Sequence, residues 1–106
     1  MDLYSDTTAA TLTSLFFELA THQNTLTTLR AELDEYFAEG ESVDSTSLTK
    51  LSYLSAAIDE ALRLHPPVPS GLQRVTPPEG LMVGEIFVPG KTIVQVPLHT
   101  IHRGML

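Results

Sequence analysis

Apolar residues recur at helical spacing through the first 64 positions of the chain. The pattern predicts helices over about residues 5–22, 24–39 and 50–64, because each segment places its apolar positions on one face. The inward face expected for the first helix is Ala9, Leu12, Leu15, Phe16 and Leu19, and that expected for the third is Leu51, Leu54, Ile58, Ala61 and Leu62. Gly40 is the expected stop of the second helix.

The pattern changes after residue 65. All 7 prolines and 5 of the 6 glycines lie beyond it, and Pro66 ends the third helix because proline lacks a backbone donor. An extended arm and β-strands are expected over residues 65–98, with a hairpin of 81–83 and 86–88 around Gly84-Glu85. A further strand is expected over 92–96. The predicted fold class is mainly α with a small antiparallel β-sheet.

Composition narrows the possible partners. The 106 residues contain 6 Lys and Arg against 13 Asp and Glu, a net charge of −7 that disfavours binding to nucleic acid. Apolar runs are far shorter than the roughly 20 residues of a membrane-spanning helix, so we expect no membrane segment in this chain. Because Met1 is followed by Asp2 rather than by basic residues and an apolar stretch, we expect no signal peptide. Cysteine is absent, which excludes thiolate chemistry by the chain itself.

Three groups of residues suggest chemistry. Glu60 and Arg63 are three positions apart on one helix and can pair, although spacing alone leaves open whether the pair is buried or exposed. Residues 5–8, Ser-Asp-Thr-Thr, stand before an apolar stripe and are ordinary N-cap residues. The histidines share no metal-ligand spacing on one helical face, which favours surface or packing roles for them: His22, His65, His99 and His102.

The segment from Glu60 to Pro67, Glu-Ala-Leu-Arg-Leu-His-Pro-Pro, resembles the Glu-x-x-Arg end of the K helix of cytochrome P-450 monooxygenases. Residues 5–8 resemble the oxygen-activating segment of that family's I helix. Residues 88–92 and 98–103 resemble the strands and short helix that follow. These segments occur in the family's order, so the resemblance covers nearly the whole chain.

The resemblance implies a partial cytochrome P-450 fold, with residues 1–106 a fragment of one domain from the late I helix to the strands after the K helix. It implies a haem-dependent monooxygenase that inserts one oxygen atom of O2 into a small organic substrate, with haem b iron as cofactor. Electrons would come from NADPH through a reductase partner. Intact eukaryotic members lie on the endoplasmic reticulum membrane. The resemblance identifies neither the localisation of this chain nor the substrate.

The resemblance also implies roles for single residues. Asp6 and Thr7 match the catalytic acid–alcohol pair that delivers protons to dioxygen. Glu60 and Arg63 match the structural ion pair that braces the haem-binding core. Arg74 matches the arginine that binds a haem propionate, although from the residues alone it is a solvated loop arginine. Residues near Ser5 and over 70–72 match parts of the substrate pocket.

Two departures from the family pattern bear on activity. Tyr4 stands where the I-helix motif has a glycine, two positions before the acid. The cysteine loop that supplies the haem thiolate is missing, so no residue here is an axial metal ligand, and the resemblance implies a chain that is inactive alone. Two alternatives stay open: a non-catalytic acidic helical interaction module, and a haem-binding pseudoenzyme that uses one of the four histidines.

Overall fold

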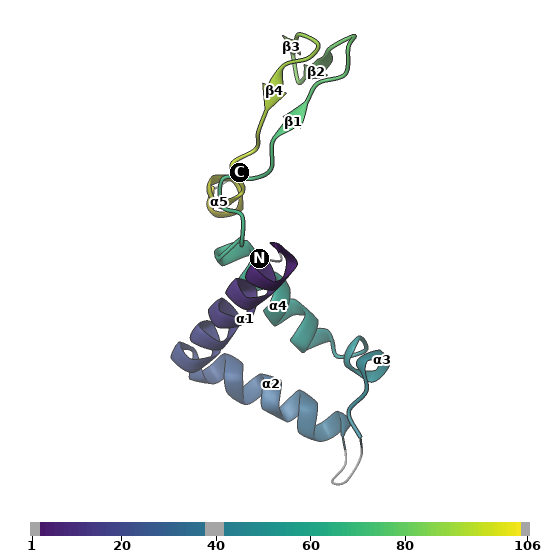
Figure 1. Ribbon diagram of the computed structural model, residues 1–106. Helices are drawn as coiled ribbons and strands as arrows, with labels where there is room; N and C mark the ends of the chain where they lie inside the picture. The colour runs from purple at the N-terminus through teal and green to yellow at the C-terminus, as the bar shows by residue number, and fades with distance from the viewer. Residues whose placement is uncertain (1–2, 38–41, 105–106) are drawn as a thin grey trace. The chain divides into compact units, whose positions relative to one another are not determined.

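The computed structural model describes residues 3–37 and 42–104 and divides the chain into two compact units. Met1–Pro67, the helical unit, contains α1 (Leu3–Thr21), α2 (Gln23–Tyr36), α3 (Ser45–Leu48) and α4 (Ser52–Leu64). Val68–Leu106, the β unit, contains β1 (Arg74–Val75), β2 (Leu81–Val83), β3 (Ile86–Val88), β4 (Ile93–Val94) and α5 (Leu98–Arg103) (Figure 1). The predicted fold class, mainly α with small antiparallel sheets, is confirmed.

The core of the helical unit forms where α1, α2 and α4 meet. Its buried members are Leu15, Leu19, Leu29 and Ala61, and partly buried residues packed against them are Leu26, Leu33, Tyr53, Leu54, Ala57 and Ile58. The stripe expected on α1 is only half correct. Leu12 and Phe16 are 49% and 67% exposed, and Ala9 is exposed as well. Successive helical residues are rotated by about 100°, so Phe16 turns away from the face that Leu15 buries.

Helix α4 begins at Ser52, two residues later than expected. The backbone N–H groups of Lys50 and Leu51 still donate to the carbonyls of Ser47 and Leu48, so the chain is a turn there. Helix α2 ends at Tyr36, and the next residue adopts extended backbone. The stop predicted at Gly40 lies outside the described residues.

Threonine hydroxyls along α1 and α2 bond to their own helix. Each donates from Oγ1 to the carbonyl four residues earlier, at 2.7–3.0 Å, and these residues are Thr11, Thr13, Thr21, Thr27 and Thr28. This is the usual way in which a threonine inside a helix satisfies its donor.

The β unit contains two antiparallel strand pairs. Strands β2 and β3 pair Leu81 with Val88 and Val83 with Ile86, which confirms the predicted hairpin. Strand β4 is shorter than the expected 92–96. It pairs with β1, which lies in the segment expected to be an extended arm. None of the described helices, in either unit, has the length and apolar character needed to cross a membrane.

Thr76 joins these strand pairs and is only 3% exposed. Its Oγ1 donates to the Pro89 carbonyl at 2.6 Å and accepts from the Thr92 N–H at 2.9 Å. Its backbone N–H donates to the Thr92 carbonyl at 3.0 Å, and its carbonyl accepts from the Lys91 N–H at 3.2 Å. All the polar atoms of this buried residue are therefore paired, as burial requires.

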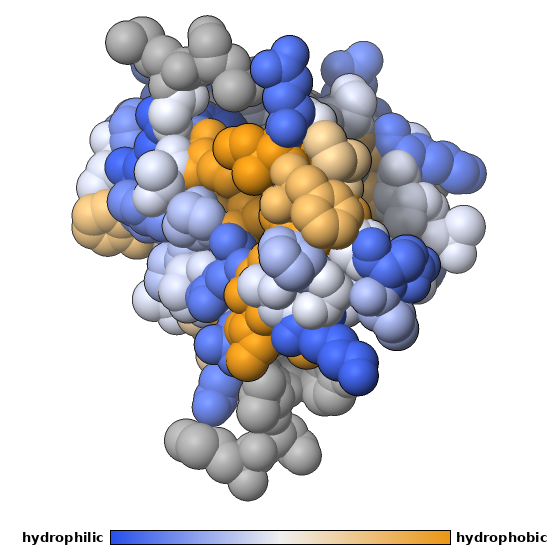
Figure 2. All heavy atoms as spheres, turned by 90° about the horizontal axis from the view of Figure 1, so that it is seen from above, coloured by the Kyte–Doolittle hydropathy of each residue, from blue (hydrophilic) through white to orange (hydrophobic). Residues whose placement is uncertain are grey.

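Apolar side chains are exposed at the end of the β unit. Met82 and Val83 are each 58% exposed, Phe87 is 57% exposed and Ile86 is 70% exposed. Figure 2, seen from above, shows apolar spheres gathered on the end where the β2–β3 hairpin lies in Figure 1. The hairpin therefore contributes little to an apolar core of its own.

Candidate functional site

The predicted pair of Glu60 and Arg63 forms on the last turns of α4. Arg63 Nε donates to Glu60 Oε2 and Arg63 Nη2 donates to Glu60 Oε1, both at 2.6 Å. Two parallel bonds between a guanidinium and a carboxylate fix the geometry as well as the charge. The spacing of three on a helix predicted that the two side chains can pair, and the structure shows that the contact is bidentate.

Both members of this pair are exposed. The Arg63 side chain is 45% exposed and that of Glu60 is 55% exposed, which answers the question that the sequence left open. The hydrogen bonds from Arg63 lower the pKa of Glu60, and those same bonds raise the pKa of Arg63. The pair is therefore fully ionised at neutral pH.

An open hollow of about 340 Å³ lies beside Glu60 in the helical unit. Its wall is largely apolar and includes Leu15, Leu19 and Leu64, while Glu18 and Glu60 place carboxylates at it. The hollow therefore has a largely apolar wall with acidic residues at it, and one of these, Glu60, belongs to the ion pair.

Glu18 connects two histidines that the sequence did not bring together. Its Oε1 lies 2.6 Å from Nε2 of His65, and its Oε2 lies 3.2 Å from Nδ1 of His22. His65 is the C-cap residue of α4, so the contact links the end of that helix to α1. The separation of 47 residues between Glu18 and His65 explains why no local pattern predicted it.

Glu32 of α2 caps the N-terminus of α4. Its Oε1 accepts from the Tyr53 N–H at 2.8 Å and its Oε2 from the Leu54 N–H at 2.9 Å, with Ser52 Oγ at 3.3 Å. A helix N-terminus has unpaired donors and a partial positive charge, which suit a carboxylate. The bond from Tyr53 is the main cause that lowers the pKa of Glu32. No local pattern in the sequence predicted a role for Glu32.

Asp6 and Thr7 lie within α1 rather than in front of it. The helix begins at Leu3, with Asp6 in its first turn, so the N-cap interpretation of residues 5–8 is wrong. Asp6 is exposed and Thr7 is partly buried, and the Thr7 carbonyl accepts from Thr11 Oγ1. The acid and the alcohol are therefore adjacent on a regular helix.

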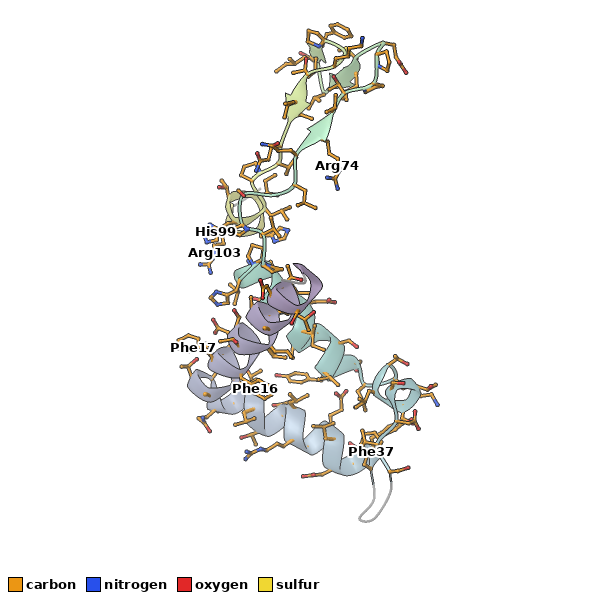
Figure 3. The ribbon with its side chains drawn as sticks, in the orientation of Figure 1. Phe16, Phe17, Phe37, Arg74, His99 and Arg103 are labelled. Carbon is orange, nitrogen blue, oxygen red and sulfur yellow. The ribbon has the colours of Figure 1, made fainter. Side chains whose placement is uncertain are left out.

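Arg74 belongs to the β unit and occupies the first position of β1. Its Nη1 donates to the Gln73 carbonyl at 2.9 Å, and Figure 3 shows the side chain extending away from β4. It lines a hollow of about 300 Å³ with Leu72, Val94 and Leu98. An exposed cation beside an apolar wall suits an apolar molecule that carries a carboxylate at its edge.

No metal site is evident among the described parts of the chain. Across residues 3–37 and 42–104, no three His, Cys, Asp or Glu side chains are grouped so that they could hold a metal ion. His22 and His65 lie in the helical unit, and His99 and His102 lie on α5. Figure 3 labels His99.

Comparison with known proteins gives consistent matches over nearly the whole chain. The family described as Cytochrome P450 matches residues 5–104. Cytochrome P450 monooxygenase FCK2 of Fusarium pseudograminearum is 56% identical over 99 residues, which cover 93% of this chain and 18% of that protein. Tryprostatin B 6-hydroxylase of Aspergillus fumigatus is 48% identical over 101 residues, again 93% of this chain and 18% of the relative. This chain therefore spans about a fifth of the length of the curated relatives it matches.

Proposed function

The chain belongs to the cytochrome P450 family, and from this premise we propose that it is part of a haem-dependent monooxygenase that inserts one oxygen atom of O2 into a small organic substrate. The observation that carries the proposal is the bidentate pair of Glu60 and Arg63 directly before Pro66-Pro67, inside the family match. Similar proteins are named a monooxygenase and a 6-hydroxylase of tryprostatin B, which supports the reaction class.

The ion pair would brace the protein around the haem. Both side chains are exposed and ionised in this chain. Removing one member would leave the other charged group without its main partner. We assign the pair a structural role, because the fixed bidentate geometry suits bracing better than chemistry at the substrate.

Arg74 would hold a carboxylate of the haem. The fit rests on the exposed guanidinium beside the apolar wall of the hollow in the β unit. A charge-assisted bond from Arg74 to a propionate would orient the group. When bound, haem supplies the iron that activates O2, and NADPH supplies electrons through a reductase. The 106 residues contain no cysteine to serve as thiolate ligand, so we propose that this chain alone has no turnover.

Asp6 and Thr7 would move protons. By the resemblance, an Asp6 oxygen would hold one proton and Thr7 Oγ1 would donate another, each from its own position on α1, because consecutive helical side chains point about 100° apart. Tyr4 takes the place of the glycine in the family pattern, which by the resemblance implies a changed pocket wall. By the same resemblance, residues 70–72 would line the substrate pocket, and the intact protein would lie on the endoplasmic reticulum membrane.

The test uses the protein encoded by the full-length transcript that contains this chain. Haem content and the carbon monoxide difference spectrum of the reduced protein are measured for the unchanged protein, Arg74→Leu and Arg74→Lys. We expect Arg74→Leu to weaken haem retention about tenfold, because it removes a charge-assisted bond, and Arg74→Lys to weaken it less. Arg30→Leu, which changes an exposed arginine on α2, is the matched control.

Two results would contradict the proposal. An unchanged protein that takes up no haem would exclude the monooxygenase function. Equal haem retention by Arg74→Leu and Arg30→Leu would exclude the role of Arg74 while leaving the function in place.

A further inference from the structure

The side chain of Gln95 spans from the end of β4 to a distant turn of the β unit. Its Nε2 donates to the Ser70 carbonyl at 2.7 Å and to the Gly71 carbonyl at 3.1 Å. A glutamine amide nitrogen carries two N–H groups, so one side chain can make both bonds. The two carbonyls are therefore fixed by a residue 24 to 25 positions away.

The same turn is held by backbone contacts. The Gly71 N–H donates to the Val68 carbonyl at 2.9 Å, and the His99 N–H donates to the Pro69 carbonyl at 3.0 Å. Gly71 has φ +79°, and a Cβ at this position would lie 1.8 Å from the Val96 carbonyl oxygen. The backbone at Gly71 therefore lies in close contact with the backbone at Val96, and only glycine fits at position 71.

This turn forms one wall of the hollow that Arg74 also lines. Gly71, Leu72 and Gln95 all line it, and Leu72 is 57% exposed. The direction of the Leu72 side chain depends on the peptide that joins it to Gly71, whose carbonyl is one of the two that Gln95 holds.

We infer that Gln95 is a positioning residue that sets the direction of Leu72, and through it the selectivity of the substrate pocket for the site of oxidation. The inference rests on the proposed function, which gives residues 70–72 their place in that pocket. Gln95 does not itself act on the substrate, because both of its donated bonds go to backbone carbonyls.

The first part of the test measures the turn in the 106-residue chain. Amide hydrogen exchange is compared for the unchanged chain, Gln95→Leu and the matched control Gln73→Leu, which alters an exposed glutamine close to the same turn. Loss of the two bonds in Gln95→Leu should speed the exchange of the Gly71 and His99 amides by about 3- to 10-fold. The control should leave both amides unchanged, and the β2–β3 amides should not respond to either change.

A third variant separates the donated bonds from the shape of the side chain. Gln95→Glu keeps the shape, but an ionised carboxylate cannot donate to a carbonyl, whereas the protonated acid can donate one bond. Protection of the Gly71 and His99 amides should therefore be low at neutral pH and should partly return below about pH 4. A side chain that only fills space would show no such recovery.

The second part measures product distribution in the haem-loaded full-length protein. Gln95→Leu should change the ratio of oxidation products by about threefold or more, with haem content unchanged, while Gln73→Leu should keep the original ratio. Unchanged amide exchange in Gln95→Leu would overturn the positioning role. Faster exchange with an unchanged product ratio would overturn the role in selectivity. Absence of any product from the unchanged protein would instead overturn the proposed function, and the exchange data would still decide the positioning role.

Discussion

The interior of each of the two units is stabilised by a different kind of contact. The helical unit buries leucine side chains where three helices meet, with Leu15, Leu19 and Leu29 at its centre. Within residues 68–104 of the β unit, the buried residues are Gly71, Thr76 and Gly80. The first unit therefore depends on apolar surface removed from water, and the second on close backbone approach and on paired polar atoms.

This difference indicates where each unit tolerates change. An apolar core accepts side chains of similar volume, because its contacts have no direction. A turn in which two backbones touch accepts no added atom, and a buried hydroxyl cannot be exchanged for a methyl group without loss of its bonds. A substitution that keeps the side-chain volume should therefore cost little stability in the helical unit but more in the β unit.

The largest effect is expected from Gly71→Ala. The added methyl group would lie 1.8 Å from the Val96 carbonyl oxygen, and φ +79° disfavours any residue with a Cβ. We expect amide protection to be lost throughout the β unit while the helical unit keeps its own. Gly84→Ala is the control, because Gly84 also has positive φ but its Cβ would meet open space. It should cost only about 1–2 kcal/mol. Equal effects of the two changes would show that the backbone contact at Gly71 is unimportant.

Leu19→Ala should produce the next largest effect, now in the helical unit. Removal of a buried leucine leaves a cavity and lowers the free energy of unfolding by about 2–5 kcal/mol. Urea unfolding followed by tyrosine fluorescence measures this unit selectively, since all 3 tyrosines precede residue 68. Leu12→Ala makes the same change at a side chain that is 49% exposed, and it should cost less than about 1 kcal/mol. A similar loss from both changes would mean that the core extends over the outer face of α1.

Thr76→Val tests the polar centre of the β unit. The change keeps the volume but leaves the Pro89 carbonyl and the Thr92 N–H without their partner, at a cost of about 1–3 kcal/mol. Exchange of the Thr92 amide reports the loss directly. Thr76→Ser retains the hydroxyl and should keep most of the protection. Equal protection of the Thr92 amide in the valine and serine variants would mean that the β unit does not depend on these hydrogen bonds.

The smallest effect is expected from Glu32→Gln, and it depends on pH. The bonds from α4 lower the pKa of Glu32 below the ordinary 4.5, so the ionised carboxylate stabilises the fold above about pH 4.5. That contribution is lost as the pH falls through the lower, folded-state pKa. The variant should be less stable than the unchanged chain at pH 7 and equal to it in stronger acid, as measured by urea unfolding.

A matched change at Glu35, exposed on the same helix, controls for the loss of one negative charge. Glu35→Gln should lower stability at pH 7 less than Glu32→Gln does, because it breaks no bond to the N-terminus of α4. A stability difference between the Glu32 variant and the unchanged chain that stayed constant from pH 7 into acid would contradict the cap.

Helical periodicity and turn chemistry predicted much of this fold from the sequence. The apolar spacing located α1, α2 and α4, and the Gly84-Glu85 pair located the hairpin. The pairing of β1 with β4 was missed because two-residue strands have no measurable period and the partners are separated by the whole hairpin. Periodicity also identified the apolar face of α1 without showing which part of it neighbours cover, so Phe16 was placed wrongly.

The candidate site was predictable only where its residues are neighbours in the sequence. The spacing of Glu60 and Arg63 predicted their contact, but exposure depends on what packs around a helix, and that information is not local. Contacts of Glu18 with His65 and of Glu32 with α4 cross 47 and 21 to 22 residues, respectively. A single sequence contains no pattern that would identify such partners.

The bonds that threonine hydroxyls make within α1 and α2 affect the hydration of these helices. A threonine that donates to its own helix, such as Thr13 or Thr27, turns its hydrogen-bonding capacity inward and leaves its methyl group outermost. Hydropathy values count such a residue as polar, although the surface it offers is largely hydrocarbon. Water can leave these faces without leaving a hydroxyl donor unpaired, so α1 and α2 are less hydrophilic than their composition suggests.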